Sequence, residues 1–287
     1  MFTDYYSPAI KRDNLARLAS PRLRFVEGDL LELDCAALLD GIDVVFHQAG
    51  QPGVRKSWGQ EFGVYSRQNV DATQRLLEAV RASSSVRRLV YASSSSIYGD
   101  ATSFPTHESD LPLPISPYGV TKLAGEHLVR LYAHSLGVET VSLRYFTVYG
   151  PRQRPDMGFS RFIAAALAGT EIEIYGDGEQ IRDFTHVDDV AAANLAAAVG
   201  AVPTGAVFNV AGGSSVSVNT VLGLIETIHG SPLRVAYRPA APGDAYRTGA
   251  STEAITSILG WHAAVPLEAG LRAQYEWAAS RSGVAIR

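Results

Sequence analysis

Cysteine, methionine and lysine are scarce in this chain of 287 residues, which has one cysteine, two methionines and only three lysines among its 25 basic residues. The single cysteine, Cys35, excludes an internal disulfide, and its place in the apolar segment CAALL is typical of a small core residue. This composition fits the reducing cytoplasm. No apolar run reaches about 18 residues, and the first residues are polar and aromatic, so we expect neither a membrane span nor export by a signal peptide.

Positive charge is also limited, because the formal net charge is -4 at pH 7 and the pI is about 6.0. A polyanion is bound by a field of concentrated positive charge, so the sequence argues against nucleic acid and an anionic membrane as partners. The seven histidines show no metal-ligand spacing, and no metal site is predicted. With 46% apolar and 19% charged residues, the chain has the composition of a globular protein of one or two domains.

Short apolar runs alternate with helical patterns along the chain. Runs that end in Gly, Asp or Ser predict buried parallel strands over residues 23–29, 43–50, 87–94, 139–150 and 206–213. The clearest helical patterns cover residues 66–82, 117–136 and 189–200. This alternation predicts an α/β fold with a Rossmann-like doubly wound parallel sheet, which binds ligands outside the carboxyl ends of its strands.

A change of pattern after Gly150 predicts a domain boundary. The Pro- and Arg-rich segment PRQRPDMG follows, and the later elements are shorter and less regular. We expect a first, nucleotide-binding domain over residues 1–150, to which parts of 182–213 return. A smaller α/β substrate domain is expected over residues 151–287.

The segment SPYGVTK places Tyr118 one helical turn before Lys122. Pro117 suits the first turn of a helix, and the four-residue offset puts both side chains on one face. A phenol with a pKa of about 10 is a poor base at neutral pH, but a nearby ammonium favours the phenolate and lowers this pKa. The pair therefore favours proton transfer to and from a hydroxyl group of a substrate.

Four consecutive serines, residues 93–96, lie at the carboxyl end of the predicted strand 87–94. Serines at a strand end commonly satisfy the backbone groups of a turn. Beside Tyr118 and Lys122, a serine hydroxyl would also hold the substrate oxygen during proton transfer.

Several motifs follow one another in a fixed order: YASSSSIYG, SPYGVTK about 20 residues later, LRYFTVYGPRQRPDM and IRDFTHVDDV. Together they resemble the extended short-chain dehydrogenase/reductases, in the branch of NAD-dependent sugar-nucleotide epimerases and dehydratases. The resemblance covers nearly the whole chain, and TDYYSPAIKRDNL and HQAGQPGVR make it strongest to UDP-glucuronate 4-epimerases. It implies NAD as cofactor, a UDP-sugar as substrate, and a homodimer formed by helices 66–82 and 117–136.

By this resemblance, Ser94, Tyr118 and Lys122 form the catalytic triad. The residues implied to border the cofactor are Asp29, Leu30, Ala49, Gly50, Asn69, Tyr118, Lys122 and Tyr145. Arg182 of IRDF is implied to bind the substrate diphosphate, which requires a cation that stays charged and can bind two oxygens.

The positions just after the triad serine discriminate among the reactions of this branch. Dehydratases and decarboxylases of the branch carry carboxylates there, whereas this chain has Ser95 and Ser96. Neutral hydroxyls cannot supply the acid and base that expel water, so we favour epimerisation at C4 through a transient 4-keto sugar. Ser95, Ser96, Thr147 and Arg154 would then bind a carboxylate at C6, although Arg154 is equally compatible with a solvent-facing loop. A UDP-glucose 4-epimerase is the alternative.

The Gly-rich turn GxxGxxG, which holds the pyrophosphate in this family, does not occur in the sequence. By resemblance, two strands and the first helix would precede FTDYYSP. Three explanations stay open: a start codon assigned too far downstream, a truncated non-catalytic remnant that binds a sugar nucleotide, or a partner that supplies the strands. Without that segment we expect weak NAD binding, open strand edges and poor solubility, and the choice between NAD and NADP is not determined.

Overall fold

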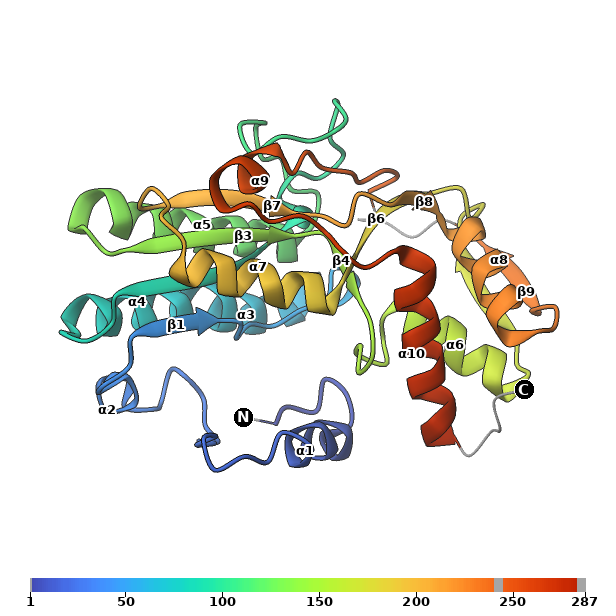
Figure 1. Cartoon of the computed structure of the whole chain (residues 1–287), viewed down its shortest axis with the longest axis horizontal. Helices are drawn as coiled ribbons and strands as arrows, with labels where there is room; N and C mark the ends of the chain where they lie inside the picture. Colours follow the sequence, from blue (N-terminus) through green and yellow to red (C-terminus); the bar gives the residue numbers. More distant parts are fainter. Residues whose placement is uncertain (1, 240–244, 283–287) are drawn as a thin grey trace.

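The computed structural model describes residues 2–239 and 245–282. Its main sheet has four parallel strands in the order β1 (Val44–His47), β2 (Arg88–Ser94), β3 (Thr140–Tyr145) and β7 (Ala206–Val210). One face is covered by η3 (Arg67–Asp71), α4 (Ala72–Ala82) and α5 (Pro117–Leu136), and the other by α7 (Val187–Val199) (Figure 1). The predicted parallel α/β sheet with helices on both faces is therefore confirmed.

The other elements form a second group, seen at the right of Figure 1. A three-stranded sheet contains β4 (Thr147–Tyr149), β6 (Ile181–His186) and β8 (Ser215–Ser217), and β5 (Ile172–Tyr175) pairs with β9 (Val235–Arg238). Three helices pack together beside them: α6 (Gly158–Ala168), α8 (Val218–His229) and α10 (Leu267–Ser282). The domain boundary near residue 150 stays a prediction.

The shorter elements connect these two groups or lie at their edges. They are α1 (Pro8–Ala16), α2 (Cys35–Leu39), η1 (Arg55–Ser57), η2 (Gly59–Glu61), α3 (Phe62–Ser66), η4 (Ser95–Ile97) and α9 (Glu253–Leu259). Cys35 is buried at the start of α2, as its apolar surroundings in the sequence predict.

The predicted strand over residues 23–29 is wrong. These residues form no strand, and the side chains of Leu23 and Phe25 are 45% and 50% exposed. β1 is the edge of the described sheet and pairs with β2, so residues 23–29 have no neighbouring strand there. An apolar run becomes a strand only when a neighbour completes the ladder of backbone hydrogen bonds, which local sequence cannot supply.

The predicted strand over residues 139–150 divides into β3 and β4, which belong to different sheets. The other predicted strands and helices are confirmed, and α5 has the predicted bounds. Ser116 caps the helix, because its side-chain oxygen accepts the N–H of Gly119 at 3.1 Å. Pro117 occupies the first turn, and Gly137 ends the helix with a positive φ of 67°. These local signals fix Tyr118 in the first turn of α5.

A buried ion pair joins α5 to the sheet. Arg144 of β3 contacts both carboxylate oxygens of Glu126 in α5, at 2.6 and 3.0 Å, and these side chains are only 2% and 1% exposed. The hydroxyl of Ser93 in β2 donates to the same carboxylate at 2.6 Å. A buried charge that loses its partner is costly, so this cluster fixes α5 against β2 and β3.

We predict that Arg144→Met lowers the free energy of unfolding by about 3 to 5 kcal/mol, because it leaves the Glu126 carboxylate buried without its cation. Urea denaturation followed by circular dichroism measures this change. The matched control is Arg87→Met, which breaks a pair with Asp43 whose side chains are 76% and 68% exposed. The control should cost less than about 1 kcal/mol, and equal losses in the two variants would contradict the prediction.

Candidate active site

β2 and α5 bring the three residues of the predicted triad together. Ser94 is the last residue of β2, and Tyr118 and Lys122 lie on successive turns of α5. Ser94 and Tyr118 are joined by a side-chain hydrogen bond. Tyr118 and Lys122 line one cavity of about 160 Å³, called here the small cavity. Its other lining residues are Gln48, Gly50, Gln51, Pro52, Asn69, Ala92, Ser93 and Tyr145.

The surroundings of Tyr118 act on its pKa in opposite directions. Burial raises this pKa, whereas the hydrogen bond with Ser94 and the positive charge of Arg154 lower it. The sequence-based expectation assigned the favourable charge to Lys122. Burial lowers the pKa of Lys122 to about 7, although the negative charge of Glu126 raises it. The Glu126 carboxylate therefore helps to keep Lys122 an ammonium, and Arg154 is a second cation, whose charge reaches the phenol of Tyr118.

Asn69 of η3 holds the loop that carries Ala49 and Gly50. Its side-chain oxygen accepts the N–H of Gln51 at 2.6 Å, and its amide group donates to the Gln51 carbonyl at 3.1 Å and to Thr121 at 3.0 Å. A Cβ atom on Gly50 would lie 2.8 Å from this side-chain oxygen, so the close approach requires glycine. The loop is thereby fixed at the carboxyl end of β1.

Asp29 and Leu30 lie in a turn that is also held by η3. The Asp29 carboxylate accepts the N–H of Leu31 at 3.0 Å and the amide of Gln68 at 3.2 Å. The bond from Leu31 is the main cause that lowers the pKa of Asp29, and Gln68 and Arg67 act in the same direction. Because Gln68 precedes Asn69, neighbouring residues of one helix position both predicted cofactor segments.

Tyr145 closes the small cavity at the end of β3. Its hydroxyl accepts the side-chain N–H of Gln48 at 2.9 Å and donates to Asn194 of α7 at 2.9 Å. Sequence reasoning missed both partners. Gln48 had a usable signal, because it lies near the carboxyl end of the predicted strand 43–50, whereas Asn194 lies within an apolar helix without any distinguishing motif.

A larger cavity of about 470 Å³, called here the large cavity, contains Thr147, Arg154 and Arg182 in its wall. Its charged lining residues are Arg55, Lys56, Arg154, Arg161 and Arg182 on the basic side, and Asp156 and Glu173 on the acidic side. The volume is that of a small-molecule site, and the excess of basic side chains favours an anionic ligand.

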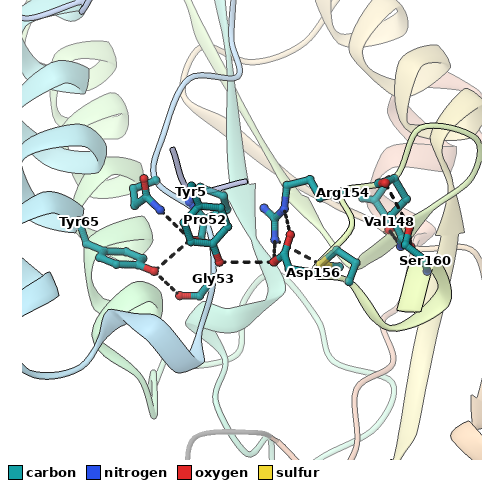
Figure 2. A network of polar contacts seen from close by, with 11 residues as sticks. Tyr5, Pro52, Gly53, Tyr65, Val148, Arg154, Asp156 and Ser160 are labelled. Carbon is teal, nitrogen blue, oxygen red and sulfur yellow. Dashed lines mark hydrogen bonds and ion pairs between the residues drawn. The ribbon is translucent and has the colours of Figure 1, made fainter. Parts of the chain in front are cut away.

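Arg154 is held in the wall of the large cavity, and its side chain is 26% exposed. Its guanidinium donates to both oxygens of Asp156 at 3.0 Å, and Tyr5 donates to the same carboxylate at 3.4 Å (Figure 2). On the other side of Tyr5, Tyr65 donates to the Gly53 carbonyl at 2.8 Å. The contact between Tyr5 and Asp156 joins the segment before α1 to the loop after β4.

The remaining predicted substrate residues are Arg182, Ser95 and Ser96. Arg182 of β6 is half-buried, and its guanidinium donates to the carbonyls of Ile181 and Tyr246 at 2.9 and 3.1 Å. Ser95 and Ser96 are half-buried in η4, and neither belongs to the walls of the small and large cavities as described. The Ser96 N–H donates to the Ser94 hydroxyl at 3.1 Å, which fixes the turn after β2.

His47 is packed and neutral rather than ligating. It is 2% exposed, hydrogen-bonds Thr73 at 2.9 Å, and burial lowers its pKa to about 3. Within residues 2–239 and 245–282, no three His, Cys, Asp or Glu side chains gather as metal ligands. In the same residues, every helix is too short or too polar to cross a membrane.

Comparison with known proteins places this site in a family. A Bacillus subtilis protein described as an uncharacterized UDP-glucose epimerase, YtcB, is 41% identical over 93% of this chain and 85% of its own length. The structure of MoeE5 in complex with UDP-glucuronic acid and NAD is 48% identical, with a TM-score of 0.86 over 91% of this chain and 86% of that one. The UDP-glucuronic acid 4-epimerase of Bacillus cereus, in complex with UDP-glucuronic acid and NAD, is 38% identical, with a TM-score of 0.92 over 95% and 87%.

A family model with the description "NAD dependent epimerase/dehydratase family" matches residues 4–211. This match covers more than half of the chain, and it includes the cofactor loops, the triad and most of the large cavity. The chain belongs to the NAD dependent epimerase/dehydratase family.

Proposed function

We propose that this protein is an NAD-dependent epimerase that inverts C4 of UDP-glucuronate. The observation that carries the proposal is the position of Arg154. Its guanidinium lines the large cavity, and its charge reaches the phenol of Tyr118 in the small cavity. A sugar held with C4 at Tyr118 would therefore present its C6 substituent to a cation. The complexes of MoeE5 and the Bacillus cereus enzyme with UDP-glucuronic acid support this choice.

The residues of the small cavity fit a nicotinamide nucleotide. Gly50 lines this cavity without a side chain of its own, and the ammonium of Lys122 suits the hydroxyls of a ribose. NAD, when bound, supplies the acceptor and donor for the hydride of C4. The residues that would hold it are Asp29, Leu30, Ala49, Gly50, Asn69, Tyr118, Lys122 and Tyr145.

The triad would move the proton that accompanies each hydride. In the first half of the reaction, the Tyr118 phenolate takes the proton of the C4 hydroxyl while Ser94 holds the oxygen. The sugar then turns over, with its diphosphate held by Arg182 and the other basic side chains of the large cavity. In the second half, Tyr118 returns the proton to the C4 oxygen. The charge of Lys122 favours the phenolate at both stages.

The C6 carboxylate would be bound by Arg154 and Thr147, with Ser95 and Ser96 as neutral neighbours. A guanidinium binds a carboxylate through two parallel hydrogen bonds, the geometry it already has with Asp156. A neutral C6 hydroxymethyl group would lack this interaction. UDP-glucose 4-epimerase therefore remains the second candidate, as the description of the Bacillus subtilis relative suggests.

We predict that Tyr118→Phe lowers epimerisation by a factor of about 10² or more and leaves UDP-sugar binding intact, because only the proton carrier is lost. NMR follows the formation of the 4-epimer, and calorimetry measures binding. Tyr237→Phe, at an exposed tyrosine of β9, is the control. A wild-type protein that binds the UDP-sugar and never turns it over would point instead to a non-catalytic remnant.

Arg154→Met should reduce kcat/KM for UDP-glucuronate by about 10-fold to 100-fold, since a charge-assisted hydrogen bond to the carboxylate is lost. The loss for UDP-glucose should be smaller. Competition between the two sugars in one NMR assay gives the ratio directly. Arg272→Met, at a side chain of α10 that is 46% exposed, serves as control. Equal losses for both sugars would exclude a carboxylate role for Arg154, and a wild type that prefers UDP-glucose would favour the alternative substrate.

We further propose a cytoplasmic homodimer that buries the outer face of α3 and α5. These two neighbouring helices carry several exposed large apolar side chains: Phe62 (42%), Val64 (44%), Val120 (47%) and Leu131 (54%). Exposed apolar surface of this kind favours a second copy of the chain as its cover.

Leu131→Glu should convert the dimer to a monomer, because the new carboxylate would be buried without a partner at the interface. Sedimentation velocity measures the mass. Leu195→Glu is a matched control, as Leu195 is 62% exposed on α7, which covers the opposite face of the sheet. A wild type that sediments as a monomer at all concentrations would overturn this proposal.

A further inference from the structure

Lys122 faces the ring of a buried tyrosine. Its ammonium nitrogen lies 4.4 Å from the centroid of the Tyr91 ring, and Tyr91 is 0% exposed. Tyr91 belongs to β2 and points to the face of the sheet that α4 and α5 cover. A cation over an aromatic face is attracted by the ring quadrupole, and the attraction is strongest where water is excluded.

The surrounding residues leave the Tyr91 ring little freedom. Its hydroxyl donates weakly to the Lys122 carbonyl at 3.4 Å, and the His47 ring packs beside it with centroids 5.5 Å apart. Gly125 of α5 provides the space for the hydroxyl, since a Cβ atom there would lie 2.2 Å from it. The ring is thus fixed under the position that Lys122 must occupy.

The charge of Lys122 has few other sources of stabilisation. The groups that act on it are Glu126 from α5, Tyr91 from β2 and His47 from β1, and Tyr118 lines the same small cavity. His47 is neutral, and Tyr118 is a negative group only when it is ionised. Glu126 is already paired with a guanidinium, so its field at Lys122 is partly cancelled. The face of the Tyr91 ring therefore supplies an interaction with the ammonium that the other neighbours do not.

We propose that Tyr91 is a positioning residue that holds the Lys122 ammonium over its ring face and keeps it charged beside Tyr118. The consequence for catalysis rests on the proposed function, because it is the proton transfer at Tyr118 that needs the neighbouring charge. The interaction itself needs neither cofactor nor substrate. It can therefore be tested on the protein alone.

The test is an NMR titration of lysines labelled with carbon-13 at Cε. The chain has only three lysines, and Lys11→Arg and Lys56→Arg variants assign the signal of Lys122. Tyr91→Phe is compared with variants that carry mono-, di- or trifluorinated phenylalanine in place of Tyr91, which keep nearly the same shape but weaken the ring quadrupole. We expect the titration midpoint of Lys122 to fall stepwise, by about one pH unit in total, while Tyr91→Phe stays near the wild type.

A midpoint that does not change along the fluorinated series would overturn the proposal. Tyr91→Leu provides a second measurement, in which the midpoint should fall at least as far as with the trifluorinated ring. In the active enzyme, the alkaline limb of the pH profile of kcat/KM should move to lower pH by the same amount. If the Tyr91 variants instead lose rate equally at every pH, with the limbs of the pH profile unchanged, the ring has only a packing role. Failure of the proposed epimerase reaction would leave the titration result unaffected.

Discussion

The charge of one buried lysine is the constraint on which the rest of this site depends. Lys122 has to remain an ammonium in surroundings that exclude water, and burial lowers its pKa to about 7 although the Glu126 carboxylate raises it. Two neighbours oppose this effect at different ranges, because the Tyr91 ring lies in contact and the Glu126 carboxylate lies one turn along α5. The neutral state of His47 fits the same constraint, since a second cation at that position would repel the ammonium.

The cluster around Glu126 also sets the geometry of the site. Arg144 donates to the Tyr98 hydroxyl at 2.6 Å in addition to its pair with Glu126, so the network extends across β3. Ser93, another member, directly precedes the triad serine, Arg144 directly precedes Tyr145, and Glu126 follows Lys122 by one turn. One buried polar network therefore fixes the backbone next to three of the proposed site residues. In a protein interior such a network is stable only when all its members are satisfied, which couples the precision of the site to the integrity of the fold.

Local sequence patterns predicted most of the fold and part of the candidate site. α5 could be predicted to the residue because its cap, its proline and its terminal glycine all lie in the sequence next to the helix. The run at residues 23–29 could not, because strand formation depends on a neighbour that local sequence does not reveal. The charged groups that act on the pKa of Tyr118 could not be predicted from the sequence either. Arg154 lies 36 positions away in the sequence, and only the folded loop after β4 shows that its charge reaches the phenol.

Arg154 connects recognition of the substrate with the strength of the base. Its guanidinium lowers the pKa of Tyr118 although it is paired with Asp156, so the pair does not cancel its field completely. A substrate carboxylate bound to the same guanidinium brings a second negative charge closer to the phenol, and this opposes ionisation of Tyr118. Tight binding of an acidic sugar therefore weakens the base that must act on it. The charge of Lys122 becomes more important for such a substrate than for a neutral one, which gives a physical reason for a ring that holds the ammonium in place.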